Sequence, residues 1–232
     1  MHAADRRRHR SKVNQRRYRL KQKAANTQLQ DDVASLRDEV RRLEAFLATM
    51  PSPYDYVQAI RDYLALFAHG YCRTVPQVQA QQDACLRSLM APHVECMGQV
   101  GIDALVHQWD LYGQLFDALH VYVHDVAPVS PRDAVVVVEA TMDLHVVVTA
   151  TTIRALFPHL LEHKAVALPT KMIGHAMTLP LHCTFEFEAT QVARLIVDAN
   201  VAVALVELTG SAADAAVALD GARIARNARL SD

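Results

Sequence analysis

The sequence predicts an α+β protein with two units: a long N-terminal helix, residues 1–50, that forms a coiled coil, and a cone-shaped domain with a curved antiparallel sheet, residues 54–228. Three observations support this division. Residues 1–23 hold ten of the 24 Lys and Arg of a 232-residue chain whose net charge is −1. Apolar residues then recur with a period of 3.5 up to a Pro-Ser-Pro break at residues 51–53. After that break, helical spacing gives way to strands rich in Val, Thr, Ile and Phe.

The composition excludes a disordered chain and a membrane span. Hydrophobic residues make up 51% of the chain, enough to bury a sizeable core. The longest stretch without Asp, Glu, Lys or Arg, residues 172–185, is shorter than the ~20 apolar residues that a spanning helix needs. The Arg-rich start lacks the apolar segment of a secretory signal, and the four cysteines form no Cys-x-x-Cys pair. We therefore expect reduced thiols, no membrane partner and no zinc bound through cysteine.

Residues 6–23 form a basic region, and residues 29–50 form a leucine zipper that we expect to continue the same helix. The apolar positions of the zipper alternate in steps of four and three, a spacing typical of a left-handed coiled coil. These positions are Leu29, Val33, Leu36, Val40, Leu43, Leu47 and Met50. Because the stripe is too narrow for packing on a globular core, it implies a partner helix. Pro51 and Pro53 end the helix, since proline removes a backbone donor.

A basic helix continuous with a zipper is the arrangement that enters the DNA major groove as a dimer. At 100° per residue, five hydrogen-bonding side chains lie close to one face of the helix, and we expect them to contact bases. They are Ser11, Asn14, Gln15, Tyr18 and Arg19. The surrounding cations are expected to contact phosphates, which provide most of the affinity. They are Arg8, Arg10, Lys12, Arg16, Arg17, Lys21 and Lys23.

At these residues the chain resembles the basic leucine zipper (bZIP) transcription factors. In that family an Arg lies ten residues before the first zipper Leu, and Arg19 and Leu29 keep this spacing. Of the family pattern N-x-x-A-A-x-x-[SC]-R, only Arg19 matches. The other places differ: Ser11 stands for Asn, Asn14 and Gln15 for the two Ala, and Tyr18 for Ser or Cys. The resemblance implies a dimeric, sequence-specific transcription factor on double-stranded DNA in the nucleus, and it carries over the docking mode without a base preference.

Two other interpretations of the basic head stay open. An Arg-rich start is also typical of a mitochondrial transit peptide or a nuclear localisation patch, although neither accounts for a zipper at the correct distance. Alternatively, the coiled coil merely dimerises the downstream domain, and the arm binds RNA or a membrane without specificity. Because about three heptads form only a marginal dimer, we expect the downstream domain to contribute to association.

The charges beside the zipper leave the choice between a homodimer and a bZIP heterodimer open. In a parallel homodimer, Asp32 would face Arg37 of the second copy and attract it. Glu39 would face Glu44 and repel it, so the two terms nearly cancel. Asn26, one heptad before the first Val of the stripe, favours a parallel register. A partner with cations opposite the two glutamates would therefore be preferred.

The downstream unit is expected to begin with helices and to continue as a sheet. Helical apolar spacing predicts helices over residues 54–72, 77–90 and 101–119. Partial alternation with β-branched residues predicts strands over residues 118–126, 134–151, 171–189 and 192–206. An Ala-rich closing helix is predicted over residues 211–228, with Ser211 as its N-cap.

Three stretches of this unit resemble the nuclear transport factor 2-like superfamily: residues 86–98, residues 100–126 and residues 185–208. Its members include ketosteroid isomerases, scytalone dehydratases, polyketide cyclases and non-catalytic dimerisation modules. The resemblance implies a cone that encloses a pocket, and a role in dimerisation or in sensing a small apolar ligand. An alternative is an isomerase- or dehydratase-like enzyme that carries a nucleic-acid-binding tail.

The sequence nominates no catalytic residue with a diagnostic spacing. An isomerase of this kind would need a carboxylate base opposite an oxyanion donor in an apolar pocket. Asp198 or Asp143 could be the base, and Tyr112 or His145 the donor, but no pattern singles them out. We therefore expect no enzymatic activity, and we nominate no cofactor.

Two histidine patterns resemble metal motifs, and we expect neither to bind a metal. Residues 159–163 read His-Leu-Leu-Glu-His, which formally matches a zinc motif that requires a longer helix than Pro158 allows. His120 and His124 are four residues apart on a predicted strand, where the strand rise separates them by about 13 Å.

Overall fold

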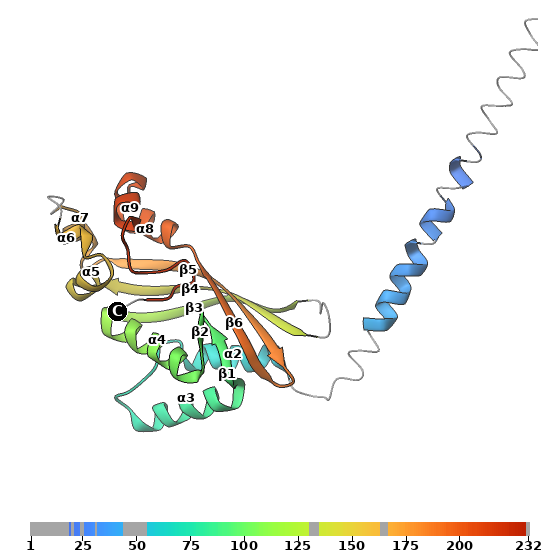
Figure 1. The fold of residues 1–232 in the computed structure, drawn as a ribbon, viewed down its shortest axis with the longest axis horizontal. Coiled ribbons are helices and arrows are strands. Elements are labelled where there is room, and N and C mark those ends of the chain that lie inside the picture. Colours follow the sequence, from blue (N-terminus) through green and yellow to red (C-terminus); the bar gives the residue numbers. More distant parts are fainter. Residues whose placement is uncertain are drawn as a thin grey trace, which may run out of the picture. The chain divides into compact units, whose positions relative to one another are not determined.

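The computed structural model describes residues 19, 21–23, 26–30, 32–43, 55–129, 135–162 and 167–230. The chain divides into two compact units, residues 1–53 and 54–232. In the first unit all described residues are helical, in agreement with the predicted helix over that part of the chain (Figure 1). The rest of the predicted helix over residues 1–50 lies outside the described residues. No helix among the described residues is both long and apolar enough to cross a membrane.

The second unit is an α+β domain, as predicted. Its helices are α2 (Tyr56–Leu66), α3 (Pro76–Leu89), α4 (Ile102–Leu115), α5 (Ala150–Leu156), α6 (His159–Glu162), α7 (Ala167–Met172), α8 (Val201–Thr209) and α9 (Ala212–Leu219). Its strands are β1 (Met90–Cys96), β2 (Gln99–Val100), β3 (Phe116–Val129), β4 (Val136–Val148), β5 (Ala176–Glu188) and β6 (Gln191–Ala199). Helices α2, α3 and α4 gather at one side of the sheet (Figure 1).

The six strands form one curved, open sheet in the order β2-β1-β6-β5-β4-β3 (Figure 1). All neighbouring pairs are antiparallel except β1 and β6, which run parallel. The prediction of four antiparallel strands was therefore wrong in two respects. It missed β1 and β2, because β1 contains Pro92 and β2 is only two residues long, so neither has a recognisable strand pattern. It also missed the parallel pairing of β1 with β6.

Strand β4 shows how side-chain alternation builds the core. Every second side chain from Val138 to Val148 is buried, whereas the side chains between them are partly or fully exposed. The buried set packs with α2 and α4 in the main apolar core, and the outward set includes Asp143 and His145. The two-residue period that predicts a strand therefore also assigns each residue to one face of the sheet.

The predicted strand over residues 192–206 is wrong after residue 199, where the chain turns into α8. The side chain of Asn200 accepts a hydrogen bond from the backbone N–H of Val203 at 3.2 Å and caps the new helix. Burial of Val201, Ala204 and Leu205 places one apolar face inward at helical spacing. This packing overrides the strand preference of the valines.

Other boundaries moved for local reasons. The predicted closing helix over residues 211–228 begins after Ser211, whose hydroxyl accepts from Asp214 N at 3.2 Å, as expected, but it ends at Leu219. Gly221, two residues after the end of α9, has a φ of 95°, which glycine adopts without steric cost. The chain after it is irregular. The predicted helix over 101–119 ends at residue 115, where β3 begins. Helices α5, α6 and α7 lie mainly between the predicted strands. The predicted strand over 134–151 is wrong at residues 150–151, which begin α5, and the predicted strand over 171–189 is wrong at residues 171–172, which end α7.

We predict that Gln82 stabilises the second unit through its buried amide. Its Nε2 donates to the carbonyls of Leu66 and Gly70 at 3.0 and 2.8 Å, and its Oε1 accepts from Cys72 N at 2.8 Å. Gln82→Ala would leave these groups without partners and should lower the free energy of unfolding by about 3 kcal/mol. The exposed neighbour Gln81→Ala should change it by less than about 0.5 kcal/mol. Equal effects in urea denaturation would contradict this role.

Candidate functional site

The described part of the zipper carries an apolar stripe without a partner. The exposed fractions of Leu29, Val33, Leu36 and Val40 are 62%, 39%, 61% and 52%. These side chains lie on residues that are helical, at the spacing of a coiled-coil seam. A shallow groove runs between Val33, Leu36 and Val40. A second helix that covers this stripe would remove a substantial apolar area from water, at roughly 25 cal/mol per Å².

Intrahelical contacts involve the polar residues beside the stripe. The side chain of Gln28 donates to Asp32 Oδ1 at 3.0 Å, and Arg42 approaches Glu39 at 3.9 Å. Arg41 pairs with Asp38. Because Asp32 and Glu39 already have partners on their own helix, the interhelical charge pairs expected from the sequence compete with these contacts. Each exposed pair contributes only a few tenths of a kcal/mol.

Only part of the predicted DNA-binding surface lies within the described residues. Arg19, Lys21 and Lys23 are helical and exposed. The other predicted base-contacting residues, Ser11, Asn14, Gln15 and Tyr18, lie outside the described residues. So do the predicted phosphate contacts Arg8, Arg10, Lys12, Arg16 and Arg17. Of the zipper positions, Leu47 and Met50 lie outside, and Leu43 is helical and partly exposed.

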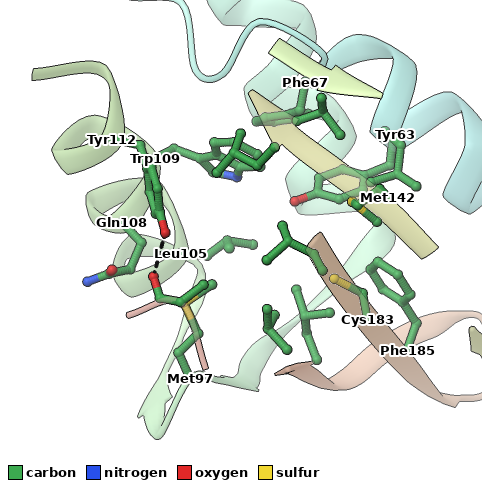
Figure 2. Close-up of a pocket in the computed structure, with 17 residues that line it drawn as sticks. Tyr63, Phe67, Met97, Leu105, Gln108, Trp109, Tyr112, Met142, Cys183 and Phe185 are labelled. Atoms are coloured by element: carbon green, nitrogen blue, oxygen red, sulfur yellow. Dashed lines mark hydrogen bonds between the residues drawn. The ribbon is translucent and has the colours of Figure 1, made fainter. Parts of the chain in front are cut away.

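The second unit contains an apolar cavity of about 70 Å³ between the helices and the inner face of the sheet (Figure 2). Aromatic rings form one wall of the cavity. The ring centroid of Phe67 lies 4.8 Å from that of Tyr63 and 5.7 Å from that of Trp109. Met142 and Cys183 lie on the sheet side. The resemblance stated from the sequence implied a pocket in this domain, but of the residues that line the cavity only Tyr112 was considered as a site residue.

The few polar atoms of the cavity differ in how they are satisfied. The Tyr112 hydroxyl donates to the carbonyl of Ala228 at 2.8 Å (Figure 2). The Trp109 indole nitrogen is buried without a well-formed hydrogen bond. The Tyr63 side chain, only 2% exposed, has its pKa raised chiefly by burial, and a contact with Trp109 opposes that rise. The Trp109 indole N–H, which lies beside the Tyr63 hydroxyl, is therefore a polar group of the cavity wall without a well-formed hydrogen bond.

The two candidate carboxylates do not meet the candidate donor Tyr112. Asp143 and Asp198 line a separate, open groove of about 610 Å³, whereas Tyr112 lines the cavity. Asp143 accepts from His124 Nε2 at 2.8 Å, and Asp198 accepts from Arg226 Nε at 3.3 Å. A carboxylate base and an oxyanion donor are thus not brought to one apolar site among the residues that the structure describes.

Only part of the histidine motif at residues 159–163 lies within the described residues. Helix α6 is short, as expected, and His159 Nε2 donates to the carbonyl of Val217 at 3.1 Å. His163 and the side chain of Glu162 lie outside the described residues. Within the described ranges, no group of three or more His, Cys, Asp or Glu residues is arranged to hold a metal ion.

The comparison with protein families found a match in the first part of the second unit. A family model described as the BZIP transcription factor 1 C-terminal domain matches residues 57–115, which run from α2 to the end of α4. No curated protein is detectably similar to the chain by sequence.

Solved structures with a similar arrangement have low sequence identity. TsrD from Streptomyces laurentii is 13% identical with a TM-score of 0.44, covering 66% of this chain and 96% of that chain. A SnoaL-like polyketide cyclase from Agrobacterium tumefaciens strain C58 is 15% identical with a TM-score of 0.45, covering 66% and 95%. An NTF2-like protein from Exiguobacterium sp. 255-15 is 13% identical with a TM-score of 0.40, covering 59% and 93%. Such values carry no conclusion about activity.

We predict that thiol reactivity reports whether the cavity is closed to solvent. Burial raises the pKa of Cys96 and of Cys183, which lines the cavity, from 9.0 to about 12. Below both values this means about 1000-fold less thiolate, the form that reacts. The Thr74 hydroxyl lowers the pKa of Cys72, so this thiol should be alkylated first.

Iodoacetamide labelling at pH 7.5, followed by peptide mass spectrometry, measures the order of reaction. All four thiols should react at similar rates in urea, which is the control. Labelling of native Cys183 as fast as Cys72 would show that the cavity opens to water and would contradict the closed arrangement.

Proposed function

We propose that the chain is a dimeric, sequence-specific DNA-binding transcription factor that acts in the nucleus, with residues 54–228 as its dimerisation or ligand-sensing domain. One observation carries the proposal. The segment that matches the BZIP transcription factor 1 C-terminal domain, residues 57–115, follows an exposed apolar stripe of coiled-coil spacing in the same chain. The predicted basic region and zipper precede this segment, and a basic helix continuous with a zipper is the arrangement that enters the DNA major groove as a dimer.

The chemistry of the basic region supports double-stranded DNA as the partner. Ten cations against one acid in residues 1–23 would neutralise many phosphates once two arms are held together. Arg19 keeps the family spacing to Leu29 and can form two parallel hydrogen bonds to a guanine edge. Asn14 and Gln15 offer both donors and acceptors where the family pattern has alanines, so we expect a base preference of its own.

For the downstream domain, dimerisation is the better supported of the two roles. A zipper of about three heptads is marginal, and a second contact would compensate for it. The cavity supports ligand sensing through the unused Trp109 donor. Its volume of about 70 Å³ is less than half of the ~150 Å³ that holds benzene in an engineered cavity, so a ligand would have to expand it.

The alternative function, an isomerase- or dehydratase-like enzyme with a nucleic-acid-binding tail, is less well supported. Asp143 and Asp198 engage His124 and Arg226 on the groove side, away from the Tyr112 hydroxyl. A carboxylate in the cavity would be needed for proton transfer at an apolar substrate. Turnover of a small ketone by the full chain, lost on Tyr112→Phe, would favour the enzyme.

We predict that Arg19→Ala removes sequence discrimination. The loss of one good base contact should weaken cognate DNA by about 1–3 kcal/mol, roughly 5- to 150-fold, and leave nonspecific binding within a few-fold. Arg16→Ala, at a predicted phosphate contact, should weaken both by similar factors. Random-site selection with the full chain, followed by gel shifts against cognate and shuffled duplexes, provides the measurement. Equal losses on both duplexes in Arg19→Ala would rule out its specific contact.

We also predict that Leu36→Ala weakens the dimer. Leu36 is 61% exposed in the single chain, and two copies would be buried at the seam. Their truncation should cost about 3–5 kcal/mol per dimer, an increase in dissociation constant of at least 100-fold. Ser35→Ala, on the same helix beside the seam, is the matched control. If sedimentation shows an unchanged dimer in Leu36→Ala, the zipper does not hold the dimer together, and residues 54–232 must do so.

A further inference from the structure

Two histidines that are 51 residues apart in the sequence meet at the edge of the second unit. His69 lies in the turn after α2, and His120 lies in β3. Their Nδ1 atoms are 3.1 Å apart, and their ring centroids are 4.5 Å apart. The backbone N–H of Val121 donates to the carbonyl of Ala68 at 2.8 Å and fixes the two segments beside each other. The imidazole pair is thus held by the fold.

The separation of the two nitrogens matches two ligands of one metal ion. With metal–nitrogen bonds of about 2.0–2.1 Å, nitrogens 3.1 Å apart subtend an angle of about 95–102° at the metal. That angle lies between the octahedral and tetrahedral values. From this geometry we propose that His69 and His120 bind a Zn²⁺ ion through their Nδ1 atoms, with water in the remaining coordination positions.

The surroundings favour neutral, oriented imidazoles. The Tyr122 ring stands edge-on to His120 at 4.1 Å and to His145 at 4.6 Å, which limits rotation of the His120 ring. Burial, together with His69 and His145, lowers the pKa of His120. An uncharged imidazole is the form that ligates a metal.

The site differs from a structural zinc site because the protein supplies only two ligands. Within the described residues no third His, Cys, Asp or Glu completes the set. Two imidazoles select borderline transition-metal ions over Mg²⁺ and Ca²⁺, which prefer oxygen. The open positions leave room for water or for a donor from a binding partner.

The two histidines also connect with the cavity wall. Gly70, next to His69, lies against Leu119 and Trp109, whose atoms would be 3.5–3.9 Å from a Cβ at that position. The ring centroids of Phe67 and Trp109 are 5.7 Å apart, and both residues line the cavity. A metal that ties His69 to His120 would therefore stabilise the α2–β3 side of the cavity and raise the unfolding temperature.

The simplest competing interpretation is a hydrogen bond between two neutral imidazoles. In that case one Nδ1–H donates to the other Nδ1, and no metal is required. The two interpretations differ in the response to Zn²⁺, since only the metal site gains stability and changes its nitrogen environment when the ion is added.

The test uses the full chain without an affinity tag, titrated with ZnCl₂ in isothermal calorimetry and in thermal unfolding. His69→Gln and His120→Gln should each weaken the strongest Zn²⁺ site at least tenfold and abolish the metal-dependent rise in unfolding temperature. His124→Gln is the matched control, because it removes an exposed histidine of the same strand that pairs with Asp143 at 2.8 Å. It should retain wild-type Zn²⁺ binding.

Nitrogen NMR of histidine-labelled protein provides a readout that does not depend on the variants. Zn²⁺ should shift the Nδ1 resonances of His69 and His120 together, at one equivalent. Three results would overturn the proposal: no Zn²⁺ site tighter than that of the His69→Gln/His120→Gln double variant, equal weakening by His124→Gln, or Nδ1 shifts at other histidines only.

Discussion

The two-residue period of strands β4, β5 and β6 determines which side chains lie on each face of the sheet. Leu144, Cys183 and Val197 point inward and line the cavity, and their neighbours Asp143, His182 and Asp198 point outward. A change of face would require a register slip of one residue, which would also expose the apolar set to water. The inner face is therefore apolar throughout, and the ionisable side chains collect on the outer face.

This division explains both the size and the chemistry of the cavity. The segment after α9 closes it, because Gln108 exchanges hydrogen bonds with the backbone of Leu230 at 3.3 and 2.9 Å. The Tyr112 bond to Ala228 holds the same segment from the same helix. The alternation of side chains along the strands places Asp143 and Asp198 outside the cavity, and the segment after α9 closes its end. The cavity is therefore small and has few polar atoms. Such a cavity is suited to packing, or to a small apolar guest, rather than to proton transfer.

The sequence predicted well what depends on local periodicity. The exposed stripe at Leu29, Val33 and Leu36, the α+β class and the N-cap at Ser211 follow from spacing or from the chemistry of a single residue. It failed where long-range contacts decide. The parallel pairing of β1 with β6 has no local sequence pattern. Helix α8 forms on a valine-rich sequence because a helix buries Val201, Ala204 and Leu205 on one face.

The histidines illustrate the same limit within one site. Sequence reasoning compared His120 with His124, four residues along the strand, and expected them not to share a metal. The neighbour of His120 is instead His69, which a turn after another helix brings to 3.1 Å. No spacing in the sequence links these two positions, since the contact depends on how α2 docks against β3. A metal-ligand search limited to sequence motifs therefore misses pairs that the tertiary fold assembles.

In the proposed function, the difference in charge between residues 1–23 and residues 54–232 couples DNA binding to dimerisation. Basic residues dominate residues 1–23, whereas acidic residues outnumber basic ones in residues 54–232. Phosphates would therefore attract residues 1–23 and repel the downstream domain, so that residues 1–23 are the part attracted to DNA. The attraction of the second arm becomes intramolecular only when the zipper holds both arms together. By reciprocity, DNA that binds two arms strengthens a zipper of about three heptads, and this gain diminishes as salt screens the phosphates.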